Sequence, residues 1–260
     1  MLPRPKKRFG QHFLTDRHYL ERIVAAIDPK PGERLVEIGP GTGLLTDLIA
    51  ARVERMDVIE IDRELAAALA RRFPPDHVRV HEADALEFDF SALGAPLRVA
   101  GNLPYNVSTP LLFRIASIAE RIEDCVFMLQ KEVAERMVAA PSTAAYGRLS
   151  VMLQYRFAMA IAFRVPPGAF TPPPKVDSAV IRMEPLGEKR LRARDENLFE
   201  RIVQAAFGQR RKTLRNALRG LATAEHIASC GVDPSSRPET VSPALFNAIA
   251  GTVELPSDAG

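Results

Sequence analysis

The sequence has few cysteines, no long apolar run and no internal repeat, and these absences narrow the class of protein. Its two cysteines, Cys125 and Cys230, lie far apart without the spacing of metal ligands, so we expect neither a disulfide nor a bound metal. No apolar stretch approaches the roughly 20 residues that cross a membrane, and the first residues lack the apolar core of a secretion signal. We therefore expect a cytoplasmic protein.

What is present suits an enzyme with a sizeable core. The chain has 260 residues, of which 47% are hydrophobic, enough for one large domain or for one medium and one small domain. Predicted strands and amphipathic helices alternate, which favours an α/β fold with a largely parallel sheet. We expect strands at about 35–38, 56–61, 78–81, 97–100, 124–129, 149–157 and 178–183, the last two as an edge pair, and helices at about 16–27, 44–52, 63–72, 108–119, 131–140, 198–221 and 243–253.

The segment from Pro185 to Asp195 is the best candidate for a linker, because it is mixed in charge and interrupted by Gly187. We therefore expect a larger domain over residues 1–187 and a small helical domain over residues 188–260.

The net charge is only +3, but the basic residues are unevenly distributed. Residues 1–17 contain five Lys or Arg and a single acid, and residues 207–220 contain five more and no acid. Such clusters suit contacts with the phosphates of a nucleic acid. The alternative is the solvated face of an ordinary helix, on which Arg211, Arg215 and Arg219 would lie together. The residues predicted to contact RNA are Lys6, Lys7, Arg8, Arg210, Arg211, Lys212 and Arg215.

A glycine motif follows the first predicted strand of the sheet. It reads Glu37-Ile38-Gly39-Pro40-Gly41-Thr42-Gly43 and precedes a predicted helix. Glycines permit a sharp turn and the close approach of a ligand to the backbone. The spacing is G-x-G-x-G, whereas nicotinamide cofactors require G-x-G-x-x-G with a pyrophosphate at the helix N-terminus. This departure favours S-adenosylmethionine, which has no pyrophosphate, although a generic nucleotide-binding turn is an alternative.

Acidic residues follow the next two predicted strands. Glu60 lies about 20 residues beyond the glycines, where a carboxylate can accept hydrogen bonds from both ribose hydroxyls of a cofactor. Asp84 follows the third strand, in a position to meet the cofactor's adenine amine. With Glu37, these residues put an acidic side chain at three successive strand ends. The alternative for any one of them is a solvated carboxylate that caps a helix.

The tetrapeptide Asn102-Leu103-Pro104-Tyr105 follows the apolar run 97–100. Its Asn side-chain oxygen and Pro carbonyl can accept both N–H groups of an adenine amine, which makes the nitrogen a better nucleophile. Tyr105 can stack on the base after the base has left its helix. The chain therefore looks like an enzyme that modifies adenine, although a plain turn at the end of a strand is the alternative.

A proline-rich loop lies late in the chain. Five prolines within residues 166–174 stiffen it and could hold Phe170 over the face of the target adenine opposite Tyr105. The alternative is a loop that one aromatic residue anchors into the core.

Together these motifs resemble the KsgA family of ribosomal RNA adenine dimethyltransferases. The matching segments run nearly end to end, at residues 7–14, 37–43, 102–110, 165–178 and 207–216. The resemblance implies a Rossmann-like class I methyltransferase fold with a small C-terminal helical domain. It also implies a monomer that uses S-adenosylmethionine to dimethylate two adjacent adenines near the 3′ end of 16S rRNA, in a precursor of the small ribosomal subunit.

The resemblance also assigns site residues by matching position. The implied cofactor contacts are His12, Leu14, Gly39, Gly41, Glu60, Asp84 and Asn102, and the implied catalytic residues are Asn102, Pro104, Tyr105 and Phe170. Many relatives have Asn in place of His12. We therefore expect a charged His12 imidazole to weaken cofactor binding, which calorimetry from about pH 5.5 to 8 would detect.

Two rival functions share part of this pattern. An antibiotic-resistance methyltransferase of large-subunit rRNA has the same glycine loop and an N-[IL]-P-Y motif, but Leu103 and residues 170–178 fit the small-subunit group better. A ribosome-assembly factor could instead bind immature subunits through the basic clusters, with methylation as a secondary activity.

Overall fold

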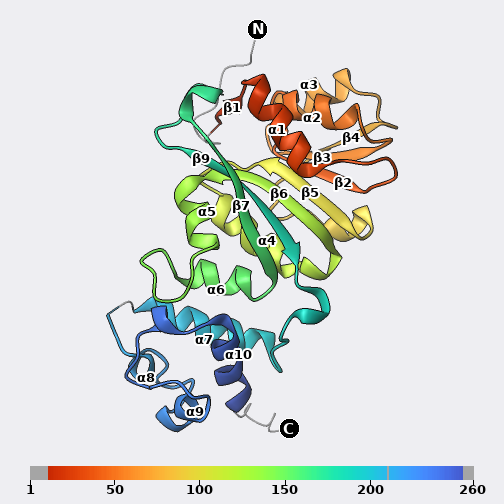
Figure 1. The fold of residues 1–260 in the computed structure, drawn as a ribbon. Helices are drawn as coiled ribbons and strands as arrows, with labels where there is room; N and C mark the ends of the chain where they lie inside the picture. The colour runs from red at the N-terminus through yellow and green to blue at the C-terminus, as the bar shows by residue number, and fades with distance from the viewer. Residues whose placement is uncertain (1–10, 210, 254–260) are drawn as a thin grey trace. The chain divides into compact units, whose positions relative to one another are not determined.

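The computed structural model describes residues 11–209 and 211–253 (Figure 1). Two compact units divide the chain. Within the described residues, the first unit comprises residues 11–134 and 158–185, and the second comprises residues 135–157 and 186–253.

The first unit is built around a seven-stranded sheet with the strand order β4-β3-β2-β5-β6-β9-β7. Neighbouring strands from β4 to β6 run parallel, and β9 is antiparallel to β6. The strands are β2 (Leu35–Ile38), β3 (Met56–Glu60), β4 (Val78–Glu82), β5 (Leu97–Asn102), β6 (Ile122–Gln130), β7 (Phe157–Val165) and β9 (Ser178–Pro185).

The buried strands form where the sequence has short apolar runs, as parallel strands covered on both faces require. All four residues of β2 are buried, and seven of the nine residues of β6 are buried as well. The expected strands over residues 35–38, 56–61, 78–81, 97–100, 124–129 and 178–183 are confirmed to within a few residues.

Helices connect the strands of the first unit (Figure 1). Asp16 caps the first helix by accepting a hydrogen bond from His18 N at 2.9 Å, and the apolar face of this helix enters the core with Leu20, Ile23 and Val24. The helices are α1 (Arg17–Ile27), α2 (Leu44–Ala50), α3 (Arg63–Arg72), α4 (Ser108–Ser117) and α5 (Lys131–Met137), and α5 continues into the second unit.

A second, two-stranded sheet fixes the start of the described chain. In it β1 (Phe13–Leu14) pairs antiparallel with β8 (Phe170–Thr171), so that Phe13 faces Thr171 and Leu14 faces Phe170. The backbone of Thr15 adds a bond from its N–H to Ala169 O at 2.9 Å. The N-terminal segment is therefore attached to the proline-rich loop.

The second unit is helical. Asp195 caps its longest helix by accepting hydrogen bonds from the backbone N–H groups of Asn197 and Leu198 at 2.8 and 3.0 Å. The helices are α6 (Arg148–Gln154), α7 (Glu196–Gly208), α8 (Leu214–Ala217), α9 (Ala224–Ser229) and α10 (Pro243–Thr252). None of the described helices, in either unit, is long and apolar enough to cross a membrane.

The expected strand over residues 149–157 is wrong. Residues 148–154 form helix α6, and the edge strand β7 begins only at Phe157. All residues from Leu149 to Leu153 are buried, so the segment has no polar face from which a helical period could be read.

The expected continuous helix over residues 198–221 is also wrong, because α7 ends at Gly208 and only the four residues of α8 follow as α-helix. Leu214 N and Arg215 N donate to Ser236 O and Pro234 O, at 2.8 and 3.0 Å, instead of to the preceding turn. Arg211, Arg215 and Arg219 therefore do not share the face of one helix.

The contacts also divide the chain differently from the expected boundary at residue 187. Residues 135–157, which the sequence placed in the first domain, group with the C-terminal helices. In the second unit, Ser150 Oγ donates to Arg136 O at 2.5 Å, and Tyr155 OH donates to Glu196 at 3.0 Å. The bond between Tyr155 and Glu196 links residues 135–157 to α7.

Candidate active site

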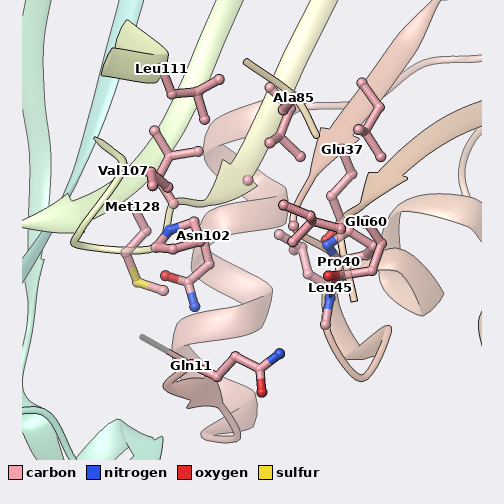
Figure 2. Close-up of a pocket in the computed structure, with 18 of the residues that line it drawn as sticks. Gln11, Glu37, Pro40, Leu45, Glu60, Ala85, Asn102, Val107, Leu111 and Met128 are labelled. Atoms are coloured by element: carbon pink, nitrogen blue, oxygen red, sulfur yellow. Dashed lines mark hydrogen bonds between the residues drawn. The ribbon is translucent and has the colours of Figure 1, made fainter. Parts of the chain in front are cut away.

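A cavity opens at the carboxyl ends of β2, β3 and β5. The strand order turns between β2 and β5, which is where open parallel sheets bind their ligands. Figure 2 shows Asn102 and Met128 on one side of this cavity and Glu37, Pro40 and Glu60 on the other. The cavity therefore brings together motifs that lie up to about 90 residues apart, as the span from His12 to Asn102 illustrates.

The glycine motif forms the turn between β2 and α2. Gly39, Gly41 and Gly43 all have positive φ, at 68°, 58° and 79°, a region that other residues rarely adopt. A Cβ atom on Gly41 would lie 3.2 Å from the ring of Phe13, and Gly39 N donates to Ile59 O at 2.9 Å. The turn is thus packed tightly against the N-terminal segment and the end of β3.

Glu60 is buried at the end of β3 and orders the backbone around it. Its Oε2 accepts a hydrogen bond from Gly41 N at 3.0 Å, and its Oε1 accepts one from Asp62 N at 2.9 Å. Burial raises the pKa of Glu60, while these two backbone bonds oppose the rise. Each carboxylate oxygen keeps a lone pair that can accept a hydrogen bond from a ligand hydroxyl.

Glu37 also lines the cavity, in agreement with its expected place among the acidic residues at three successive strand ends. Thr46 Oγ1 donates to Glu37 Oε2 at 2.6 Å, and both side chains are buried. Burial raises the pKa of Glu37 to about 8, and the nearby carboxylates of Glu60 and Asp47 add to the rise. The carboxyl group is therefore mostly protonated at neutral pH.

Asp84 follows β4 and lines the cavity as expected. Its Oδ1 accepts a hydrogen bond from Leu86 N at 2.9 Å, which fixes the side chain in a short turn. Ala85 and Leu86 continue the wall beside it. A carboxylate next to apolar atoms is a suitable site for a planar ring that carries an amine.

Asn102 ends β5, and its amide has a defined orientation. The side-chain Nδ2 donates to His12 O at 3.0 Å, and a carbonyl oxygen can only accept, so the nitrogen must be the atom on that side. The Oδ1 atom is left to accept a hydrogen bond from a ligand. Gly101 brings this strand close to β2, because a Cβ on it would lie 2.3 Å from Ile38 O.

Pro104 and Tyr105 line the same cavity. Pro104 O already accepts a hydrogen bond from Val107 N at 3.1 Å and keeps a second lone pair. The ring of Tyr105 stacks against His12 with centroids 5.6 Å apart, and its hydroxyl is hydrogen-bonded to Ser178. Burial raises the pKa of Tyr105. Asn102, Pro104 and Tyr105 are therefore brought together as the sequence predicted.

His12 and Leu14 enter the cavity wall from the N-terminal segment. His12 Nδ1 donates to Pro172 O at 2.9 Å, since a carbonyl cannot donate. The expected effect of a charged His12 ring on cofactor binding stays a prediction.

Phe170 is the expected site residue that the structure does not bring to the cavity. It is only 3% exposed, pairs with Leu14 across the small sheet and belongs to the apolar core. It is not among the described residues that line the cavity. The expectation that Phe170 covers the target adenine stays a prediction. Its position in this structure is that of the alternative, an aromatic residue that anchors the loop into the core.

The expected RNA contacts divide into two groups. Lys6, Lys7, Arg8 and Arg210 lie outside the described residues. Arg211, Lys212 and Arg215 are exposed in the second unit, around the short helix α8.

The sequence missed several cavity residues that only the fold brings together. Gln11 Nε2 donates to Asp62 Oδ2 at 3.2 Å, and Met128 reaches the cavity from β6. Neither residue lies in a glycine or acidic motif. Gln11 belongs to the family-like segment 7–14 and precedes His12, and the sequence signal of Met128 is its position near the carboxyl end of an apolar strand.

Fold and site together define the class of protein. The sheet is parallel from β4 to β6, with a glycine turn after β2, acidic residues at or after the ends of β3 and β4, and an antiparallel strand beside β6. This combination identifies the protein as a class I S-adenosylmethionine-dependent methyltransferase.

Two solved structures share the fold. A dimethyladenosine transferase from Plasmodium falciparum has a TM-score of 0.77 at 24% identity, covering 92% of this chain and 96% of its own. The 23S rRNA methyltransferase ErmE has a TM-score of 0.71 at 26% identity, covering 93% and 99%.

The chain belongs to the ribosomal RNA adenine dimethylase family, whose model matches residues 3–254. It is 55% identical over 254 residues to the ribosomal RNA small subunit methyltransferase A of Aromatoleum aromaticum, covering 98% of this chain and 96% of that protein. The protein of the same name from Laribacter hongkongensis is 56% identical over 239 residues, covering 91% of each. The resemblance inferred from the motifs is therefore confirmed.

Proposed function

We propose that this enzyme transfers methyl groups from S-adenosylmethionine to N6 of two adjacent adenines near the 3′ end of 16S rRNA, and dimethylates each of them. The observation that carries the proposal is the oriented amide of Asn102, which shares one cavity with Tyr105 and with the acidic residues of the cofactor motif. We further propose that it acts as a monomer on a precursor of the small ribosomal subunit in the cytoplasm.

The residues around the glycine turn fit the cofactor. Glu60 would accept hydrogen bonds from the ribose hydroxyls of the cofactor, and Asp84 would accept one from the cofactor's adenine amine. Both side chains line the cavity, and both have lone pairs that can accept a further hydrogen bond. Gly39 and Gly41 let the backbone approach it, and His12 and Leu14 would contact it from the N-terminal segment. The cofactor supplies a methyl group on a positively charged sulfur, which is already activated for transfer.

The target base would be held by the residues that follow β5. Asn102 Oδ1 and Pro104 O would accept the two N–H groups of the adenine amine, which concentrates the lone pair on nitrogen and aims it at the methyl group. Tyr105 would stack on the extruded base. When the N–C bond forms and the S–C bond breaks, the nitrogen becomes cationic and loses a proton to water. Rate enhancement thus comes mainly from positioning, without a strong general base.

The comparisons favour small-subunit rRNA as the substrate over large-subunit rRNA. The relatives at 55% and 56% identity are small-subunit methyltransferases by name, whereas the 23S rRNA enzyme is 26% identical. Leu103 and the loop before β9 point the same way, because they fit the small-subunit pattern better.

The proposal is tested by incubating the enzyme and labelled S-adenosylmethionine with small subunits that lack these methyl groups, and then mapping the product. We expect dimethyladenosine at two adjacent positions. Asn102→Ala should abolish turnover, because the amine loses its acceptor, while calorimetry should show cofactor binding that is weaker but measurable.

Asn197→Ala is a matched control for this experiment, because Asn197 is exposed in the second unit and its side chain makes no hydrogen bond with the described residues. It should methylate like the wild type. Wild-type methylation by Asn102→Ala would contradict the mechanism, and label found only in the large-subunit RNA would contradict the substrate.

A further inference from the structure

Tyr105 is held at three points, two of them on its side chain. Ser108 Oγ donates to Tyr105 O at 3.2 Å and fixes the backbone. The phenol oxygen is hydrogen-bonded to Ser178 Oγ at 2.5 Å, and the His12 ring lies against one face of the Tyr105 ring with an angle of 28° between the planes. A planar base can therefore stack only on the opposite face of Tyr105.

Ser178 is well placed to hold this ring still. It is the first residue of β9, it faces Gln130 across the sheet, and it is fully buried. Its hydroxyl therefore moves with the sheet and not with the loop that precedes it. A hydrogen bond from a buried, rigid hydroxyl fixes the direction of a side chain that would otherwise rotate about two bonds.

The proline-rich loop and the strand after it are hydrogen-bonded to the same pair of rings. Pro172, within the loop, accepts the hydrogen bond from His12 Nδ1, and Ser178, where β9 begins, bonds to Tyr105. Three consecutive prolines, residues 172–174, limit the backbone here. The loop thus braces the His12–Tyr105 pair, a role that differs from the adenine cover expected of Phe170.

We propose that Ser178 is a positioning residue for methyl transfer, which sets the Tyr105 ring at the angle needed to stack on the target adenine. This inference rests on the proposed function, since it presumes an extruded base at Tyr105. Ser178 need not touch the base or the cofactor. It acts through the phenol oxygen of Tyr105 alone.

A double-mutant cycle tests this claim, because a residue that acts only through another has no effect once the other group is gone. Ser178→Ala and Tyr105→Phe each remove one side of the hydrogen bond, and Tyr105→Phe keeps the ring. Each should lower kcat for methylation of small subunits about tenfold, with the KM for S-adenosylmethionine within about twofold of the wild-type value. The double variant should be no slower than either single variant.

Two results in this assay would overturn the proposal. One is an unchanged kcat for Ser178→Ala. The other is a double variant about a hundredfold slower than the wild type, because multiplying effects would mean that Ser178 acts independently of Tyr105.

The same four proteins also give a cycle of unfolding free energies in urea, without any substrate. We expect the effects of Ser178→Ala and Tyr105→Phe on the free energy of unfolding to be coupled. Without such coupling, the claim that Ser178 holds the Tyr105 ring would be contradicted, whatever the activities of the variants are. If the wild type methylates no ribosomal particle but the coupling is present, the proposed function fails while Ser178 still holds the ring.

Ser150→Ala is the matched control. Ser150 is likewise fully buried, and its hydroxyl donates a hydrogen bond of 2.5 Å to Arg136 O and accepts one of 3.1 Å from Gly147 N, but it lies in the second unit. Ser150→Ala should lower stability at least as much as Ser178→Ala and leave kcat unchanged. An equal loss of kcat in Ser150→Ala would assign the effect of Ser178 to general destabilisation and overturn the proposal.

Discussion

Glu37 combines burial with a titratable carboxyl group beside the cavity. Its pKa rises from the ordinary 4.5 to about 8 because burial disfavours the charged form, even though Thr46 donates a hydrogen bond to it. The stability associated with protonated Glu37 is present in full below about pH 4.5 and is lost as the pH rises towards 8.

Glu37→Gln should therefore remove part of the pH dependence of folding. An amide cannot ionise, yet its oxygen can still accept the Thr46 hydrogen bond. Relative to the wild type, the variant should gain stability between about pH 5 and pH 8, on the order of 4 kcal/mol at the upper end. Urea unfolding at several pH values measures this difference.

Glu54→Gln provides the comparison, because Glu54 is an exposed glutamate in the same unit. It should retain the pH profile of the wild type. Parallel profiles for Glu37→Gln and the wild type would show that burial does not keep Glu37 protonated.

At the scale of elements, Arg98 joins four parts of the first unit at the end of the sheet away from the cavity. Its guanidinium donates to both carboxylate oxygens of Asp124 on β6, at 2.8 Å each, and to Glu33 Oε2 at 2.6 Å. It also donates to the carbonyls of Ile27 and Asp28 at the end of α1. The hydrogen bonds with Asp124 raise the pKa of Arg98 further above its already high ordinary value.

Arg98→Leu should destabilise the protein by about 3–5 kcal/mol, because among the described residues it leaves the buried carboxylate of Asp124 with the half-exposed Arg182 as its one ion-pair partner. Chemical denaturation followed by circular dichroism gives the difference. Arg17→Leu, which breaks an exposed ion pair with Glu21, should change stability far less than Arg98→Leu does. Equal effects of the two substitutions would mean that the Arg98 network contributes no more than a surface pair.

The elements also explain how much of the fold could be predicted. The parallel strands were readable because burial on both faces leaves uninterrupted apolar runs such as Leu35–Ile38. Helix α6 could not be predicted, because its residues are buried on all sides and the sequence therefore lacks the alternation of apolar and polar residues that identifies a helix. The break after Gly208 depends on hydrogen bonds to residues 234 and 236, which no local pattern reveals.

Most of the site could also be predicted from the positions of its residues relative to the parallel strands. Gly39, Glu60, Asp84 and Asn102 each end or follow a parallel strand, and such strand ends meet at one edge of a sheet. Ser178 was missed because its position beside Tyr105 depends on the pairing of β6 with β9. The composition of the proline-rich loop does not tell whether the Phe170 ring turns towards the core or the cavity, and in this structure the ring lies in the core.

At the scale of the whole molecule, the exposed basic residues Arg211, Lys212 and Arg215 are predicted to contribute to RNA binding. Replacing all three with Gln should weaken binding to small subunits about tenfold or more at moderate salt. It should also reduce the slope of log affinity against log salt by up to about 0.7–0.9 for each phosphate that the variant no longer neutralises. Filter binding across a salt series measures both quantities.

Arg52, Arg55 and Arg71 provide a control with the same change in net charge. They are exposed near the amino ends of the strands, opposite the cavity edge of the sheet. Their replacement with Gln should leave the salt slope unchanged. If both triple variants lose affinity equally, binding depends on overall charge and not on the cluster around α8.

The pairing of the N-terminal segment with the proline-rich loop has a consequence for synthesis. His12 meets Pro172 across 160 positions of the chain, and Asn102 takes its orientation from His12. A growing polypeptide that has passed the glycine turn and Asn102 therefore still lacks a finished pocket. The hydrogen bonds from His12 to Pro172 and between Tyr105 and Ser178 can form only after translation has passed Ser178, so a fragment that stops earlier lacks them however well its first strands have folded.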